Sequence, residues 1–231
     1  MGYHAILLNV AALLLAILSL LSHRVLCRSS SASLIALPNC PEKCGDITVP
    51  YPFGIGDECH YGNPIDDVHY NFTCDTTRDP PALLFGPEIE VANISLANGE
   101  LRAVHYVSYS CFDKGMSEAN FILTVALERL TISSTQNSLV AIGCDTYGWF
   151  SGTGTTNGTV FNAGCMTVCN YAQKDLLHKK CSGIGCCLGF IPDGVNEISI
   201  EAKSYNDHLN VSNFNPCSVA FMVANDAMPA D

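Results

Sequence analysis

Paired carboxylates are the groups in this sequence whose spacing comes nearest to catalytic chemistry. They occur as Asp57-Glu58, Asp66-Asp67 and Glu88-Ile89-Glu90. A glycoside hydrolase needs two carboxyl groups that face each other across a glycosidic bond, and neighbours in the chain do not establish that arrangement. We expect the first two pairs to be solvated loop charges and the third to lie on one exposed strand face.

Other catalytic motifs are missing from the sequence. The chain has no Gly-x-Ser-x-Gly elbow, no His-Glu-x-x-His motif and no phosphate-binding Gly-rich loop with a Lys. Its seven His are scattered without a metal-ligand spacing. We therefore predict a binding protein that is not an enzyme and carries no resident metal or cofactor.

Cysteine is the most informative residue type. Of the thirteen cysteines, one is Cys27 in the N-terminal segment, which leaves an even dozen. These are Cys40, Cys44, Cys59, Cys74, Cys111, Cys144, Cys165, Cys169, Cys181, Cys186, Cys187 and Cys217. Such a density persists as disulfides only in an oxidising compartment, so we expect all twelve to pair and the chain to work outside the cell.

The later cysteines allow two interpretations. The adjacent Cys186 and Cys187 would point to opposite sides of an extended segment, each bridged to a different partner, and would join two layers. Alternatively, Cys165-x3-Cys169 and Cys181-x4-Cys186 superficially resemble four zinc ligands. We favour disulfides, because thiols of a secreted chain are oxidised and Cys187 would otherwise have no role.

The N-terminal run Ala5–Leu21 is predominantly apolar, and its 17 residues suit a long signal-peptide core better than a membrane span. We predict a signal peptide over residues 1–27, a linker over 28–39, a cysteine-rich domain over 40–223 and a tail over 224–231. An uncleaved anchor is the alternative, because Arg24 and Arg28 follow the run and no Lys or Arg precedes it. It would leave the cysteines in the cytosol, so the cysteine content favours secretion.

Four Asn-x-Ser/Thr sequons agree with secretion, at Asn71, Asn93, Asn157 and Asn210. Such triplets are acceptors for N-glycans on the surface of secreted proteins. We therefore predict a secreted glycoprotein.

Charge limits the possible partners. Eleven Lys and Arg against 22 Asp and Glu give a net charge of −11 at pH 7. A balance this acidic argues against nucleic acid and against unaided adsorption to an anionic membrane.

The elements that must position these groups are predicted to be strands. Tyr70 and Phe72 fall on one face of residues 69–74, while Asn71 and Thr73 fall on the other, as in a half-buried strand. Further strands are expected over 121–132, 138–143, 197–202 and 218–223.

Turns and loops complete the predicted fold. Asn98-Gly99 suits a two-residue hairpin turn between segments 94–97 and 101–103. Residues 151–159 are small and predict a loop, and residues 165–180 have the only spacing compatible with a short helix. The fold class is therefore all-β, disulfide-rich, with long loops and at most one or two short helices.

Aromatic residues provide two candidate sugar platforms. Tyr51 and Phe53 lie in an extended, proline-rich block, where we favour a role in core packing over sugar stacking. Tyr147 and Trp149 lie beside the small-residue segment, and for them the two roles are about equally supported.

The opening cysteine block resembles a known family. Residues 40–55 read CPEKCGDITVPYPFGI and are similar to the start of the galacturonan-binding extracellular domain of plant wall-associated receptor kinases. Later landmarks follow in the family's order: Phe72-Thr73-Cys74, Ile142-Gly143-Cys144-Asp145, GCMTVC at 164–169, CSGIGCC at 181–187 followed by Ile191-Pro192, and PCSVAFMV at 216–223. The resemblance covers residue 40 to about residue 223.

The resemblance implies non-catalytic binding of de-esterified pectin, a polyanion, at the plant cell wall. Charge opposes this, because loss of Arg24 with the signal leaves ten basic residues against 22 acidic ones, a balance of −12. Binding would need a local patch of cations near an aromatic surface, or Ca²⁺ bridging protein and ligand carboxylates. The candidate ligand-binding residues are Lys43, Arg78, Arg102, Lys114, Arg129, Tyr147 and Trp149, with Lys179 and Lys180 as further cations. Each cation taken alone is more simply an ordinary solvated charge.

A structural or protein-binding ectodomain without direct pectin contact is the second hypothesis. The family's usual architecture continues into EGF-like modules, a transmembrane helix and a cytoplasmic kinase, whereas this sequence has no second hydrophobic span and no kinase motif. We expect a short secreted form or a truncated product. A membrane location or a membrane-receptor partner would then come from longer relatives.

Overall fold

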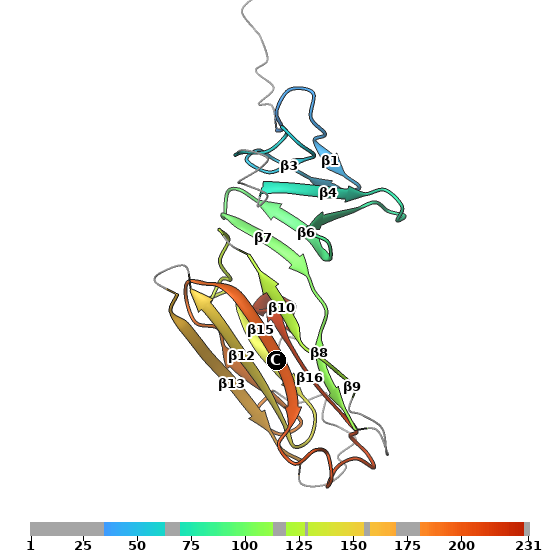
Figure 1. Cartoon of the computed structure of the whole chain (residues 1–231), viewed down its shortest axis with the longest axis vertical. Coiled ribbons are helices and arrows are strands. Elements are labelled where there is room, and N and C mark those ends of the chain that lie inside the picture. Colours follow the sequence, from blue (N-terminus) through green and yellow to red (C-terminus); the bar gives the residue numbers. More distant parts are fainter. Residues whose placement is uncertain are drawn as a thin grey trace, which may run out of the picture.

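The computed structural model describes residues 35–62, 70–112, 119–127, 129–154, 158–169 and 181–228, mainly as strands and turns (Figure 1). The predicted signal peptide and the cations Lys114, Lys179 and Lys180 lie outside the described residues, as does Asn157. Within the described ranges the chain is all-β and disulfide-rich, which confirms the predicted fold class.

Residues 35–104 form an N-terminal unit, at the top of Figure 1. Its strands are β1 (Lys43–Cys44), β2 (Ile47–Thr48), β3 (Gly54–Ile55), β4 (Asn71–Asp75), β5 (Ala82–Phe85), β6 (Ile89–Ser95) and β7 (Glu100–Val104). β1 pairs with β2, and the other five strands form one sheet in the order β3-β4-β5-β6-β7. Only the β3–β4 pair of this sheet is parallel.

Aromatic rings hold the core of the N-terminal unit together. Phe53 and Phe72 stack with ring centroids 5.1 Å apart, and Phe85 meets Phe72 edge-on at 6.0 Å. All three side chains are buried, which confirms the packing role predicted for Phe53. Core packing was also predicted for Tyr51, but this side chain is 41% exposed. Among the described rings it contacts only Tyr61, edge-on.

Two disulfides close the N-terminal unit, Cys40–Cys59 and Cys44–Cys74. Gly54 lies where the chain passes close to itself, since a Cβ there would be 1.9 Å from the carbonyl oxygen of Cys59. The glycine in the PYPFG block is therefore required by backbone contact.

Residues 108–224 form a C-terminal unit of two facing sheets. Its strands are β8 (Ser108–Cys111), β9 (Ala119–Phe121), β10 (Leu123–Ala126), β11 (Asn137–Ile142), β12 (Thr146–Gly154), β13 (Val160–Thr167), β14 (Cys186–Phe190), β15 (Val195–Ser204) and β16 (Cys217–Ala224), followed by the 3₁₀ turn η3 (Asn225–Ala227). Sheet 1 has the order β10-β15-β12-β13 and sheet 2 the order β14-β11-β16-β8-β9. All pairs within them are antiparallel.

A second core lies between these sheets. Phe150, Ile198 and Ile200 of sheet 1 are buried against Leu139 and Ala141 of sheet 2. This core is separate from that of the N-terminal unit, and Leu127 packs against both. The predicted domain bounds of 40–223 stay a prediction.

The disulfides of the C-terminal unit confirm the predicted role of the adjacent cysteines. Cys187 bonds Cys165 and so joins β14 of sheet 2 to β13 of sheet 1, whereas Cys186 bonds Cys181. The remaining pairs are Cys144–Cys169 and Cys111–Cys217. All twelve cysteines are therefore paired, including the four of the zinc interpretation.

The hairpin between β6 and β7 differs from the prediction. Ser95 pairs with Glu100, so residues 96–99 form a four-residue loop instead of a two-residue turn. The amide of Gly99 donates to the carbonyl of Leu96 at 3.2 Å, and only Gly99 takes the positive φ, at 65°. Glu100 therefore pairs with Ser95, whereas a two-residue turn at Asn98-Gly99 would have paired it with Ala97.

The structure differs from three local predictions in the C-terminal unit, within the residues that it describes. Ser151–Gly154 continue β12 rather than starting a loop, and the small residues are needed there because a Cβ on Gly152 would be 2.7 Å from Val195 Cγ1. Of the segment 165–180, which was compatible with a short helix, Cys165–Thr167 end strand β13, and residues 170–180 lie outside the described residues. The strand expected through residue 132 ends at Ala126, although the amides of Leu127 and Ile132 still donate to the carbonyls of Asn196 and Val195.

Asp145 fixes the loop that follows β15. Its buried carboxylate accepts hydrogen bonds from the Tyr205 hydroxyl at 2.7 Å and from Asn206 Nδ2 at 2.5 Å. Desolvation of the phenol and the hydrogen bond to Asp145 raise the pKa of Tyr205 to about 12. The end of the 142–145 landmark is thereby joined to a segment 60 residues further along the chain.

We predict that the disulfide joining the two sheets stabilises the fold more than the short one beside it. Replacing Cys165 and Cys187 with Ser should lower the free energy of unfolding by about 3 kcal/mol, because the bond closes a span of 22 residues. Replacing Cys181 and Cys186, only 5 residues apart, should cost about 2 kcal/mol. Denaturant titration measures both, and a larger loss from the short pair would contradict the prediction.

The Tyr205 contact predicts a pH dependence. Because its folded pKa lies above the unfolded value of about 10, its contribution to stability is complete below pH ~10 and is lost as the pH rises toward 12. Titration of tyrosinate absorbance should show a transition near pH 12 that Tyr205→Phe removes and Asp145→Asn moves downward. Tyr106→Phe, at an exposed ring, is the control and should leave that transition in place.

Candidate functional site

Two hollows lie where the N-terminal and C-terminal units meet. The larger, the junction groove, has a volume of about 640 Å³. One wall comes from β6, β7 and their loop, and the other from β10, residues 129–137 and the end of β16. The smaller, the junction pocket, has a volume of about 210 Å³ and shares Ile89, His105 and Val125 with the groove.

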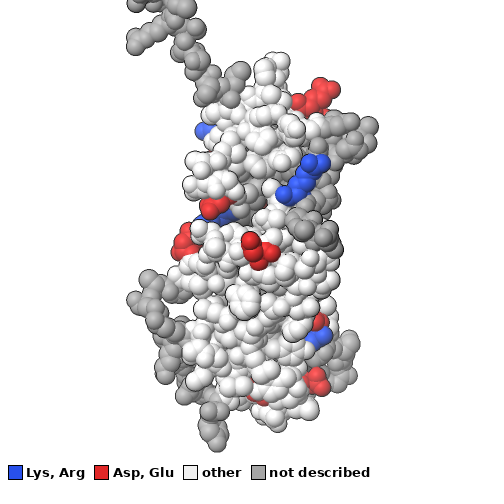
Figure 2. Space-filling view, turned by 90° about the vertical axis from the view of Figure 1, so that its left-hand side faces the viewer, with Lys and Arg blue, Asp and Glu red and all other residues white. Residues whose placement is uncertain are grey.

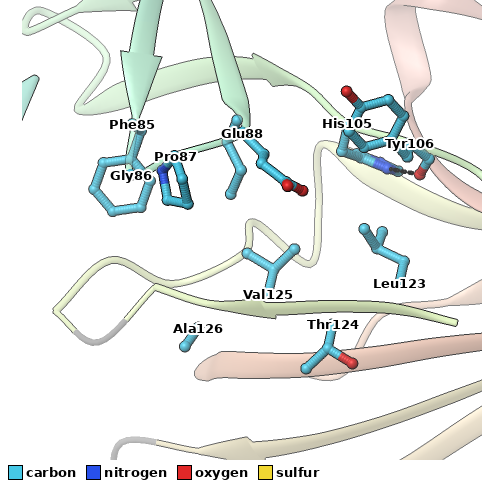
Figure 3. A pocket seen from close by; sticks show the side chains of 11 residues that line it. Phe85, Gly86, Pro87, Glu88, His105, Tyr106, Leu123, Thr124, Val125 and Ala126 are labelled. Carbon is cyan, nitrogen blue, oxygen red and sulfur yellow. Dashed lines mark hydrogen bonds between the residues drawn. The ribbon is translucent and has the colours of Figure 1, made fainter. Parts of the chain in front are cut away.

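The junction pocket is mainly apolar (Figure 3). Leu123 and Val125 point into it from β10, opposite the Phe85–Glu88 turn. The ring of His105 is held at one end, with Nδ1 2.6 Å from the carbonyl oxygen of Tyr106. Its small volume and few polar groups suit packing between the units better than a ligand.

The junction groove brings together two of the predicted cations, Arg102 and Arg129. Arg102 lies on β7, and its Nη2 donates to the Asp226 carboxylate at 2.6 Å, across the groove. This hydrogen bond and the charge of Asp226 raise the pKa of Arg102, so the guanidinium remains cationic. Both side chains of the pair are more than half exposed, and their attraction is therefore screened by water.

The rest of the groove can meet the hydroxyl groups and apolar faces of a sugar. Its polar lining consists of Asn93, Ser95, Asn98, Glu100, Thr131, Ser133, Gln136 and Asn137. Apolar side chains such as Leu101, Leu130 and Met222 lie among them. Amides and hydroxyls beside apolar patches and two arginines form a surface that suits an acidic carbohydrate.

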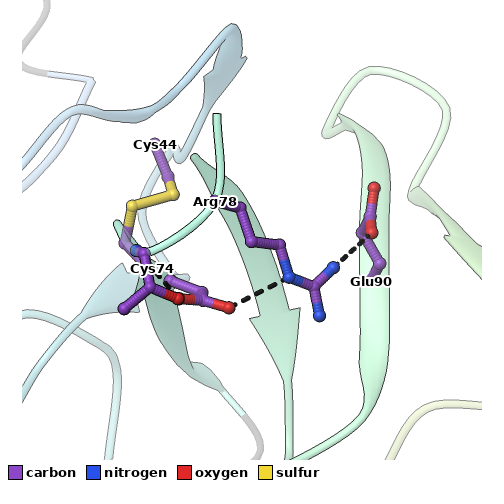
Figure 4. A network of polar contacts seen from close by, with 6 residues as sticks. Cys44, Cys74, Arg78 and Glu90 are labelled. Carbon is purple, nitrogen blue, oxygen red and sulfur yellow. Dashed lines mark hydrogen bonds and ion pairs between the residues drawn. A yellow bond between two sulfur atoms is a disulfide. The ribbon is translucent and has the colours of Figure 1, made fainter. Parts of the chain in front are cut away.

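The other predicted cations lie elsewhere. Lys43 is exposed on β1, away from the lining of both hollows. Arg78 donates to Asp75 and to Glu90, at 3.0 Å each, and so joins strands of the N-terminal sheet (Figure 4). Hydrogen bonds from Thr77, followed by the charge of Arg78, lower the pKa of Asp75, which keeps this pair ionised. Arg78 is therefore placed as a structural cation.

The distribution of charged side chains on the surface agrees with the separate positions of these cations. On the face shown in Figure 2, basic side chains are few, lie apart and alternate with acidic ones, and most of the lower half is uncharged. The single continuous basic patch that a polyanion would favour is not seen on that face. The junction groove is the place where the described residues put two predicted cations on one hollow.

Tyr147 and Trp149 occupy a different surface. They lie on the outer face of sheet 1, since Gly148 and Phe150 between and beside them point inward and are buried. Trp149 is 43% exposed and is opposite Gly164 on β13, which leaves its ring room to lie flat. Neither aromatic residue lines the groove, so the structure separates the predicted aromatic platform from the predicted cations.

Lys203 was not among the ligand-binding residues predicted from the sequence. It lies opposite Tyr147 on the neighbouring strand β15 and pairs with Glu201 at 2.6 Å. A strand alternation through residues 197–203 puts Glu201 and Lys203 on one face, but only the pairing of β12 with β15 shows that this face also carries the aromatic residues.

Comparison with known proteins finds a family match in the N-terminal unit. Residues 40–105 match the family model described as wall-associated receptor kinase galacturonan-binding. The chain is therefore similar to the galacturonan-binding domain of wall-associated receptor kinases. The matched span includes the β6–β7 wall of the junction groove and Arg102.

The similarity to individual relatives extends beyond the family match. Wall-associated receptor kinase 5 of Arabidopsis thaliana is 33% identical over 187 residues, and wall-associated receptor kinase 2 of the same plant is 31% identical over 185 residues. Each alignment covers 80% of this chain, which spans about a quarter of the length of these relatives, 24% and 23% respectively. No solved structure matches the chain.

Two features are absent from the described part of the chain. No helix there is long and apolar enough to cross a membrane. No cluster of three or more His, Cys, Asp or Glu there is arranged to hold a metal ion.

Proposed function

We propose that this chain binds pectic galacturonan outside the cell without cleaving it, and that the polymer contacts the junction groove. The observation that carries the proposal is the overlap between the galacturonan-binding family match and the β6–β7 wall that holds Arg102. The six disulfides support an extracellular setting. A protein-binding role is the second candidate, and the exposed aromatic residues Tyr109, Phe121 and Phe190 of sheet 2 favour it.

The groove would recognise galacturonate by exchanging one carboxylate for another. In the chain alone, the guanidinium of Arg102 donates a hydrogen bond to Asp226. An exposed ion pair of this kind contributes only about 0–1 kcal/mol. A carboxylate of the polymer would replace it at little cost, while Arg129 lines the same groove and would attract a neighbouring carboxylate. Asn98 and Gln136 would hydrogen-bond the ring hydroxyls.

The absence of cleavage is part of the proposal. The groove carboxylates among the described residues are Glu100 and Asp226, and Asp226 is held in the ion pair with Arg102. Hydrolysis would need one carboxyl group kept protonated as an acid and a second one across the scissile bond. A carboxylate that accepts a hydrogen bond from a guanidinium, as Asp226 does from Arg102, is not placed to donate a proton to a leaving group.

Calcium is proposed as an aid to binding. The chain carries a net charge of −11, so long-range repulsion opposes a polyanion. Ca²⁺ held between carboxylates of the polymer and those of the protein would reduce that repulsion. A membrane receptor is a further proposed partner, suggested only by the longer relatives.

Substitutions at the ion pair should change affinity in opposite directions. We expect Arg102→Gln to weaken binding to polygalacturonate several-fold, because about 0.5–1 kcal/mol of interaction is lost. Asp226→Asn should strengthen binding, because it frees the guanidinium and removes a repelling charge. Calorimetry at low salt, with Ca²⁺ and with chelator, measures both.

Two control variants make this test specific. Arg78→Gln removes the same charge from a cation that lies outside the groove, and Asp46→Asn removes an exposed carboxylate on the β1–β2 turn. Both should change affinity less than the groove variants do, and rising salt should weaken binding of every form. No retention of polygalacturonate under any of these conditions would reject the proposal, and shortening of the polymer would reject its non-catalytic half.

A glycan at Asn93 should limit access to the groove. Asn93 lines the groove and pairs in register with Arg102, so a glycan there would crowd the cation. We expect Asn93→Gln and Ser95→Ala, which abolish the same sequon through different residues, to bind polygalacturonate more tightly than the glycosylated chain. Asn210→Gln, in the loop after β15, is the control and should leave affinity unchanged. Equal affinity of all four forms would contradict the prediction.

A further inference from the structure

Sheet 2 has an inverted pattern of side chains. Along β16, the large residues Val219, Phe221 and Val223 point away from sheet 1, whereas Ser218 and Ala220 point toward it and are fully buried. A sheet with one solvated face normally places its large apolar residues inward and polar ones outward. Here most of the large residues are on the outside, and only Met222 near the end of β16 packs against the core.

The same inversion occurs in the strands beside β16. On β8, Ser108 and Ser110 are buried, while Tyr109 between them is exposed. On β14, Cys187 and Gly189 face inward, while Leu188 and Phe190 are exposed. The pattern thus extends over β8, β14 and most of β16, whereas β11 places Leu139 toward sheet 1.

Hydrogen bonds across the core show that this orientation is enforced. Ser108 Oγ donates to the carbonyl oxygen of Ile200 at 2.5 Å and accepts from the amide of Leu123 at 3.0 Å. Ser218 Oγ and Thr146 Oγ1 are 2.6 Å apart and share a hydrogen bond. Turning either strand over would bury the large residues and expose these bonded hydroxyls, so the outward position of the large residues is fixed.

The outward side chains form one continuous surface, because directly paired residues of antiparallel strands lie side by side on one face. One row crosses all five strands through Phe121, Tyr109, Val219, Ile142 and Cys186. The next rows are Phe221-Val140-Leu188 and Val223-Ser138-Phe190. We call these eleven residues the apolar face; none of them is charged, and Ser138 is its polar member.

The apolar face is large enough for a stable interface. Tyr109, Phe121 and Phe190 on it, with Tyr106 packed edge-on against Phe121, are 38–77% exposed. Since a fully exposed aromatic side chain presents ~200 Å², these four rings alone present on the order of 400 Å². A standard interface takes about 800 Å² from each partner, so the rings supply about half of it. Leu188, which is 44% exposed, adds to this area, whereas Val140 and Cys186 on the same face are already buried.

The arrangement of the face matches a second copy of itself. Aromatic rings lie at both edges, Phe190 on β14 and the stacked Tyr109–Phe121 pair on β8 and β9, and β16 is the central strand. A two-fold axis parallel to the strands over β16 would lay β14 of one copy against β9 of the other. Phe190 of each copy would then meet the Tyr109–Phe121 pair of its partner, as a self-complementary interface requires.

The net charge of the chain also favours a second copy as the partner at the apolar face. Two copies that each carry −11 repel one another through most of their surfaces. The uncharged apolar face is where they approach without placing like charges in contact. We propose that a second copy of this chain covers the apolar face, so that the protein is a two-fold dimer joined through sheet 2.

Sedimentation of the purified mature chain tests the proposal. The unmodified chain should be a dimer with a dissociation constant of ~1 µM or lower. Leu188→Lys combined with Phe190→Lys should raise that constant more than about tenfold. Tyr109→Lys, at the opposite edge, should have a similar effect because the axis brings the two edges together.

Controls separate loss of the interface from loss of the fold. Val160→Lys replaces an exposed side chain of sheet 1 and should leave the dimer intact. Each Lys variant should keep all thiols oxidised and unfold cooperatively as a monomer. A chain that stays monomeric at ~100 µM, or Lys variants at both edges that associate as the unmodified chain does, would overturn the proposal.

Salt distinguishes this interface from the galacturonan contact. Dimerisation should persist or strengthen as salt rises, because screening reduces the repulsion between acidic copies, whereas galacturonan binding should weaken. If dimerisation is not observed, galacturonan binding can therefore still be measured, and the reverse also holds.

Discussion

The close approach of the two sheets in the C-terminal unit is the constraint on which most of the structure depends. Small residues of sheet 2 face sheet 1, and a Cβ on Gly148 would lie only 2.8 Å from the Cβ of Ala141. The Cys165–Cys187 bond and the hydroxyl contacts of Ser108 and Ser218 hold the sheets at this separation. Sheets this close leave little room for large side chains from both sides, so sheet 1 supplies Phe150, Ile198 and Ile200 while sheet 2 adds mainly Leu139 and turns most of its other large residues outward.

The same packing decides where recognition can occur. β10 belongs to sheet 1 through its pairing with β15, and the chain beyond Ala126 leaves that sheet to meet the N-terminal unit. Leu127 and Leu130 pack there against the core of the N-terminal unit. The junction groove, which Arg102 and Arg129 both line, lies at this contact. The polar groove therefore lies between the two units, whereas the apolar face lies on the outer side of sheet 2, and each suits a different kind of partner.

Residue type alone did not locate the candidate site. Seven ligand-binding residues were expected from the sequence, and the groove contains Arg102 and Arg129 of them. Arg78 is bound by Asp75 and Glu90 because the pairing of β4, β5 and β6 brings these acids to it. Tyr147 and Trp149 do share a face, as their spacing on a strand requires, but neither lines the groove that contains the arginines. Exposed charges carry no periodic signal, since they contribute nothing to the core that sets the register.

The amino-acid sequence by itself determined the features that depend on neighbours in the chain or on composition. It specified an oxidised all-β chain, the full pairing of twelve cysteines, the divergence of Cys186 and Cys187, and the burial of Phe53, because dense cysteine, period-two alternation and adjacent residues on a strand have few structural outcomes. Tertiary structure decided which cysteines pair, which side of sheet 2 faces the core, and which cations meet. Alternation along β16 is the same whether Val219 or Ser218 points inward. Only the space available against sheet 1, and the hydrogen bonds that the buried serines find there, select between the two.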